Sequence, residues 1–287
     1  MSLGGGIHWK GPLLGSDEAG PFEDIATSVW SDNSSRFKTY VEDFDSVMAD
    51  GELAARGVTV SDINTATSPT EVVTKETGYL LINPGTKADS GTHTQAVAAA
   101  SSTIHPEFQT IGPIVSTATL MDSREMAFET RIGVQSDTTV WDGKVILGWL
   151  ASDASPMGTD GIPSLTTGGG IGFHFHSDGV LRYFARQTAL TAVAHMTDTV
   201  IDITTLTTAA VFQWYKLGFR AKWADASAGT GAVSFFVNDR KVGEITTDLP
   251  MASTQTYGVA FGVLNGAARV SDLAVDYVIT AITGPGR

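Results

Sequence analysis

The chain has 287 residues, of which 42% are hydrophobic and 17% are charged, and it contains no cysteine. Disordered chains show the reverse balance, so most of this chain should pack into one large domain or two small ones. The missing cysteines exclude disulfides, thiol catalysis and cysteine-ligated zinc. A formal net charge of −13 with scattered basic residues disfavours nucleic-acid phosphates as a partner.

The first 39 residues are rich in Gly, Ser and Asp and keep neither a strand period nor a helix period. They predict an extended N-terminal arm (1–39) in front of a folded domain (40–287). The arm carries four isolated aromatic side chains: Trp9, Phe22, Trp30 and Phe37. These side chains could dock into a partner, or the segment could be disordered or pack on its own domain. We expect no signal peptide and no membrane-spanning segment, because no suitable apolar stretch occurs.

From Tyr40 onward apolar and polar residues alternate, which predicts antiparallel strands with one face toward a core. The alternation is clear in four runs, at 127–135, 214–223, 257–264 and 273–279. In the last run, four residues should share the core-facing side: Leu273, Val275, Tyr277 and Ile279.

Two dipeptides mark hairpin turns between alternating runs, Asp178-Gly179 and Asn238-Asp239. The Ala-rich stretch 94–102 predicts one short helix. Long loops at 151–170 and 224–231 are of the kind that carries binding or contact residues. Many strands with few helices predict an all-β fold, a two-sheet antiparallel sandwich.

The order of these segments resembles the concanavalin A-like jelly roll, the fold of legume lectins, laminin G-like modules and laminarinase-type glycosidases. The segments that carry the resemblance are YVEDFDS (40–46), FETRIGV (128–134), WYKLGFRAKW (214–223) with VSFFVNDRKVGEITTDLP (233–250), and SDLAVDYVIT (271–280). The resemblance implies that the last strand pairs back with the first. The sequence as a whole, without a shared motif, also resembles virion proteins of tailed bacteriophages that carry an N-terminal arm and one jelly roll. Several of those proteins decorate or cement the head.

Glu125 and Glu129 are the nearest candidates for a pair of catalytic carboxyl groups. Four residues along one strand place them about 13 Å apart, whereas glycosidases need about 5–9.5 Å. The Glu-x-Asp-x-x-Glu pattern of laminarinase-type enzymes is also missing. Glycoside hydrolysis is therefore the least favoured function, and we expect no catalytic residues and no enzyme.

His174 and His176 lie two residues apart and should point to the same side of a strand. A shared metal would need a third ligand, for which His195 is the nearest candidate in sequence. The favoured alternative is two polar side chains on the sheet face opposite Ile171, Phe173 and Phe175. We expect no metal and no cofactor.

The loop 151–170 offers only Asp153 and Asp160, whereas calcium takes six to eight oxygen ligands. Stacking faces for a sugar could come from Trp141, Trp149 and Trp223, although tryptophans in a sandwich are more commonly buried.

Together these patterns favour a structural or interaction protein. The expected function is that of a capsid decoration or cement protein on the capsid surface of a tailed-phage virion, which binds across neighbouring major capsid subunits. A homo-oligomer is expected, and a trimer would suit capsid symmetry. The candidate partner-binding residues are Trp9, Phe22, Trp30, Phe37 and Phe236. Phe236 should face away from the core, either covered by a loop or available to a neighbour.

The alternative is a carbohydrate-binding, lectin-like module with a glycan as its partner. Deleting residues 2–38 should leave the sandwich folded and weaken assembly.

Overall fold

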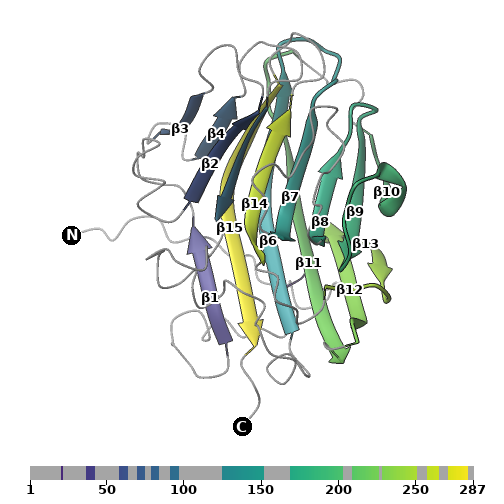
Figure 1. Cartoon of the computed structure of the whole chain (residues 1–287). Coiled ribbons are helices and arrows are strands. Elements are labelled where there is room, and N and C mark those ends of the chain that lie inside the picture. The colour runs from purple at the N-terminus through teal and green to yellow at the C-terminus, as the bar shows by residue number, and fades with distance from the viewer. Residues whose placement is uncertain are drawn as a thin grey trace, which may run out of the picture.

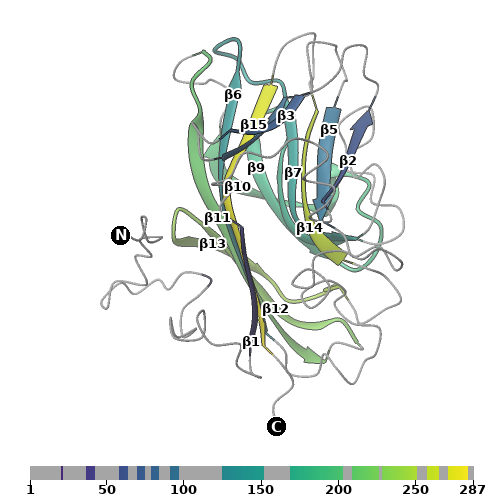
Figure 2. The ribbon, with the colours of Figure 1, turned by 90° about the vertical axis from the view of Figure 1, so that its left-hand side faces the viewer.

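The computed structural model describes residues 21, 37–42, 58–63, 70–74, 79–83, 91–96, 125–151, 169–202, 209–225, 228–250, 257–264 and 271–283. The described strands form two antiparallel sheets that lie face to face (Figures 1 and 2). This arrangement is the two-sheet antiparallel sandwich that the sequence predicts. The part of the chain that the structure describes contains no helix long and apolar enough to cross a membrane.

The eight-stranded sheet has the order β13-β12-β11-β6-β15-β4-β3, with β1 also paired to β15. Its strands are β1 (Phe37–Glu42), β3 (Thr70–Thr74), β4 (Tyr79–Asn83), β6 (Glu125–Ser136), β11 (Gln213–Asp225), β12 (Thr230–Val237), β13 (Arg240–Ile245) and β15 (Ser271–Thr283). The last strand therefore pairs back with the first, as the resemblance implies. Strand β4 pairs with the N-terminal part of β15 and β1 with its C-terminal part.

The seven-stranded sheet has the order β10-β9-β8-β7-β14-β5-β2. Its strands are β2 (Val58–Ile63), β5 (Gly91–Ala96), β7 (Lys144–Ala151), β8 (Gly170–Phe175), β9 (Val180–Arg186), β10 (Thr197–Asp202) and β14 (Tyr257–Leu264). A 3₁₀ turn, Val193–His195, leads into β10.

The main core lies between the two sheets and is built from the alternating residues that the sequence indicates. Both sheets contribute large apolar side chains, among them Phe128, Phe173, Phe219, Phe235 and Phe261. A second, smaller apolar cluster lies on the other face of the seven-stranded sheet, around Ile146, Leu150 and Phe184. Burial of this kind stabilises a fold by about 1.5–3 kcal/mol per large apolar side chain.

Strand β15 departs from the simple alternation predicted for 273–279. Its pairing with β6 shifts between Val275 and Tyr277, so Asp276 is an extra residue in a β-bulge. Leu273 and Val275 face the core, and after the bulge Val278 does so in place of Tyr277. The prediction that Tyr277 and Ile279 share the core face was wrong, because a single extra residue reverses every side chain beyond it.

Two further expectations change with the structure. Residues 94–96 belong to β5, so the helix predicted at 94–102 is wrong there; residues 97–102 lie outside the described residues. Strand β1 begins at Phe37, so residues 37–39 of the predicted arm belong to the sheet. The deletion of 2–38 would accordingly remove part of β1.

Both predicted hairpins are present. Gly179 has φ of 76° and its N–H donates to the His176 carbonyl at 2.9 Å, which closes the β8–β9 turn. Asn238 and Asp239 have φ of 49° and 67°, the left-handed pair that joins β12 to β13. The Asn238 side chain also accepts a hydrogen bond from the Lys216 backbone N–H at 3.0 Å, which ties this turn to β11.

Candidate functional site

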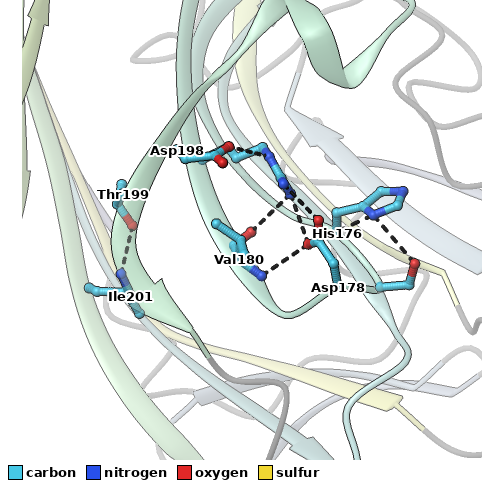
Figure 3. A network of polar contacts seen from close by, with 8 residues as sticks. His176, Asp178, Val180, Asp198, Thr199 and Ile201 are labelled. Carbon is cyan, nitrogen blue, oxygen red and sulfur yellow. Dashed lines mark hydrogen bonds and ion pairs between the residues drawn. The ribbon is translucent and has the colours of Figure 1, made fainter.

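A cluster of charged side chains lies at one edge of the seven-stranded sheet (Figure 3). It lies on the face that points away from the main core, because Leu181 and Tyr183, its neighbours along β9, belong to that core. Its centre is Arg182 on β9, whose side chain is only 8% exposed. The guanidinium donates from both terminal nitrogens to the Asp178 carboxylate, at 2.9 and 2.6 Å. Its Nε donates to Asp198 on β10 at 2.6 Å. We call Asp178, Arg182 and Asp198 the arginine clamp.

The local sequence explains this geometry. Asp178 occupies the β8–β9 turn, and its Oδ1 accepts a hydrogen bond from the Val180 N–H at 3.0 Å. Antiparallel pairing places Arg182 opposite Asp198 on β10. A bidentate arginine–carboxylate pair is planar and directional, so it fixes the orientation of both groups.

The contact between Asp178 and Arg182 favours the ionised form of both groups. Hydrogen bonds from Arg182 are the main reason that the pKa of Asp178 is lowered, against a smaller opposing effect of burial. The same pair raises the pKa of Arg182. The carboxylate side chains of Asp178 and Asp198 are 45% and 64% exposed, so they present fixed acceptor oxygens to solvent while the cation beneath them is covered.

The two strand histidines lie beside the clamp. His174 is buried on the face opposite Phe173 and Phe175, which is the favoured alternative from the sequence, and it pairs with Arg182 in the strand register. The His176 ring lies 5.8 Å from the His174 ring, and its Nδ1 is 3.8 Å from Asp178 Oδ1. Within the described ranges, no three His, Asp or Glu side chains, His195 included, are grouped to hold a metal ion.

Glu125 and Glu129 lie on the other sheet and have separate partners. Glu125 contacts Arg220 at 2.7 Å and Lys222 at 3.0 Å, whereas Glu129 contacts Lys216 at 3.2 Å and accepts from the Tyr277 hydroxyl at 2.9 Å. The two carboxylates therefore contact different cations, and neither is the other's partner in these contacts.

The remaining candidate residues are the aromatic side chains and the two loop aspartates. The side chains of Trp141, Trp149 and Trp223 are buried, so they present no stacking face to a sugar. Phe236 is 7% exposed, which is the covered state of the two that the sequence left open. Phe37 starts β1 opposite Thr283. The remaining candidates lie outside the described residues: Trp9, Phe22, Trp30, Asp153 and Asp160.

Neither Arg182 nor Asp198 was predicted from the sequence. A signal was present for Arg182, because it follows the predicted Asp178-Gly179 turn by a few residues in the same hairpin. Asp198 carried no signal, since its contact depends on β10 pairing with the edge of β9.

No protein-family model matches the chain, and no curated protein matches it. Among solved structures, the carbohydrate recognition domain of Emp47p aligns with a TM-score of 0.50 and 8% identity, covering 88% of this chain and 99% of that chain. The chain has a concanavalin A-like fold.

Other similar structures are alginate lyase Aly36B and peanut lectin. The lyase has a TM-score of 0.48 and 10% identity, covering 85% of this chain and 96% of its own. The lectin has a TM-score of 0.43 and 9% identity, covering 88% of this chain and 99% of its own.

Proposed function

We propose that the chain is a carbohydrate-binding module that recognises a neutral glycan through the arginine clamp. The observation that carries the proposal is the pair of exposed carboxylates, Asp178 and Asp198, held on one covered guanidinium. Adjacent hydroxyl groups of a sugar are hydrogen-bond donors that match such fixed acceptor oxygens.

Preorganisation is the reason that this arrangement suits binding. A free carboxylate side chain loses rotamer freedom when it binds a ligand, at a cost of about 0.5–1.5 kcal/mol per side chain. Arg182 already fixes both carboxylates through contacts of 2.6–2.9 Å, so the clamp has met that cost during folding. Charge-assisted hydrogen bonds to a sugar then contribute more of their energy to affinity.

Charge selects the ligand class. Two exposed carboxylates around one arginine leave the clamp with an excess of negative charge, and the whole chain carries a net charge of −13. A glycan that bears uronate or sialate groups would be repelled. The proposed ligand is a neutral sugar with two adjacent hydroxyls, bound without a metal and released unchanged.

The fold supports this proposal without deciding it. The Emp47p domain, named for carbohydrate recognition, shares the fold, but one fold hosts many functions. The clamp is therefore the feature to test.

The test is a glycan array probed with the purified chain, with and without calcium. We expect binding to neutral glycans in both conditions and none to acidic ones. Asp198→Asn should weaken binding about 10- to 100-fold, the worth of one hydrogen bond to a charged group. Glu244→Gln is the matched control, because Glu244 is an exposed acid on β13 of the other sheet, and it should bind as the wild type does. A blank array, or full binding by Asp198→Asn, would refute the proposal.

The capsid-decoration function that the sequence favoured gains no support from the similar structures named above. Its candidate residues Trp9, Phe22 and Trp30 lie outside the described residues. Ordered density after mixing the purified chain with empty phage heads, together with a blank glycan array, would favour it.

A further inference from the structure

Four residues form a row across the outward face of the eight-stranded sheet. Strand pairing places Ile279, Glu129, Gly218 and Phe236 side by side on β15, β6, β11 and β12. Their neighbours along each strand face the core, so these four point away from it. We call them the outer row. Residues on an outward sheet face are expected to be exposed to solvent, yet Ile279, Glu129 and Phe236 are only 2%, 3% and 7% exposed.

Gly218 has no side chain and leaves a space in this row, and Pro21 occupies that space. A β-carbon built on Gly218 would lie 2.7 Å from Pro21 Cγ and 3.5 Å from Pro21 Cβ. Pro21 is itself buried. Any side chain at position 218 would therefore displace the proline, and a rigid ring fills the space that the glycine leaves.

The residues beside this gap behave as covered groups. Burial is the main reason that the pKa of Glu129 is raised, against the opposing effects of Lys216 and Tyr277. Phe236 is a large apolar side chain that would otherwise face water. Tyr277 and Lys216 contact Glu129, and Pro21 is a described residue that lies against Gly218 in the same row.

We propose that the outer row is an intramolecular docking surface, and that Pro21 of the same chain docks on it with Gly218 as the floor. The docked proline shields Phe236, Ile279 and Glu129 from solvent.

A disulfide trap tests the docking directly, because the 287-residue chain has no cysteine of its own. The β-carbon separation of 3.5 Å between positions 21 and 218 falls at the short end of the range for disulfides. The double variant Pro21→Cys with Gly218→Cys should therefore form an intramolecular crosslink under mild oxidation. Pro21→Cys with Val200→Cys is the matched control, since Val200 lies exposed on β10 of the other sheet, and it should not crosslink within one chain.

A second experiment covers the case in which Gly218→Cys disturbs the strand, because its β-carbon also lies 2.8 Å from the Phe128 carbonyl oxygen. Phe236→Cys places a single thiol in the outer row, and Val237→Cys places one in the core behind it. Pro21→Asp should speed labelling of the thiol at 236 at least tenfold and leave the thiol at 237 within about twofold. Faster labelling at both positions would report general unfolding rather than undocking.

An intramolecular crosslink between positions 21 and 218, with faster labelling only at position 236, supports the proposal. A crosslink that joins two chains would overturn docking in cis and assign the outer row to a second copy. No crosslink, with labelling at 236 unchanged by Pro21→Asp, would show that Pro21 does not cover the row.

Discussion

Glu129 shows how one residue depends on its surroundings. Its carboxylate lies on an outward sheet face, yet it is buried and is held by the Tyr277 hydroxyl and the Lys216 ammonium. Lys216 is shared, because its Nζ also contacts Asp239 at 2.7 Å. Burying a charge costs free energy unless the charge is paired, and Tyr277 and Lys216 offset that cost for the Glu129 carboxylate.

Replacing Glu129 with Gln should change how stability depends on pH. The pKa of Glu129 is raised in the folded chain, so its contribution to stability is fully present below about pH 4.5 and is lost as pH rises through the raised value. We therefore compare the free energies of unfolding of Glu129→Gln and the wild type between pH 4.5 and 8. The value for the variant minus the value for the wild type should increase with pH, by less than about 1.4 kcal/mol per pH unit. The pKa values of Lys216 and Tyr277 are raised, which keeps both groups protonated in this window.

Urea unfolding of both proteins at several pH values measures the difference. Glu244→Gln serves as an exposed control with the opposite sign, because the pKa of Glu244 is lowered by Lys241. A constant difference between wild type and Glu129→Gln across the window would contradict the prediction.

The sheet face on which a residue lies could be predicted from the sequence where alternation along a strand determines it. Phe236 was expected to face away from the core, and it does. Its burial could not be predicted, because Pro21, which lies against the neighbouring Gly218, is distant in sequence. Arg182 and Asp198 were missed for the same reason, since their contact is made by strand pairing.

At the scale of elements, the bulge in β15 decides which side chains reach the core. Asp276 is the extra residue, and its carboxylate accepts a hydrogen bond from Arg131 at 2.9 Å. Arg131 also lies 4.6 Å from the centre of the Trp214 ring. The bulge therefore carries exposed polar contacts on its outer side and leaves Val275 and Val278 facing inward.

Deleting Asp276 should be tolerated. The deletion removes the extra residue, so Val275, Tyr277 and Val278 keep their faces in a regular ladder. The loss is an exposed ion pair, worth about 0–1 kcal/mol, with some strain from altered twist. Deleting Ala274 instead turns Leu273 out of the core and should lower the free energy of unfolding by at least about 2 kcal/mol more.

Thermal and urea melts of the two deletions make this comparison. Equal losses, or a larger loss from the Asp276 deletion, would show that the bulge has a structural role that face alternation does not capture.

Alternation and turn residues predicted the hairpins and most strand faces, because both signals are local. The bulge in β15 was not predictable, since its sequence reads as unbroken alternation. The helix expected at 94–102 failed at 94–96, where pairing with β14 and β2 overrides the propensity of the Ala-rich stretch.

For the whole molecule, β14 and β15 join parts of the sandwich that are far apart in sequence. Among the described strands, β14 links β2 and β5 to the rest of the seven-stranded sheet, and β15 links β1, β3 and β4 to the rest of the eight-stranded sheet. The arrangement is visible in Figure 1, where both strands run through the middle of the molecule.

Removing residues 271–287 should therefore abolish cooperative folding. Strand β6 would lose one of its two partners along nearly its whole length, and β4 and β1 would lose the strand that joins them to the rest of the described sheet. Far-UV circular dichroism and a denaturant melt would show the loss. A truncated chain that melts in one transition near the wild-type midpoint would contradict this account.

The central position of β14 also has a consequence during synthesis. Strand β5 ends at Ala96 and its partner β14 begins at Tyr257, so at about 5–20 residues per second the ribosome delivers that partner roughly 10–30 s later. Through that interval the early strands present unpaired edges to every other nascent chain nearby. A chaperone that binds extended segments would thus have its main opportunity before the last 31 residues, 257–287, emerge.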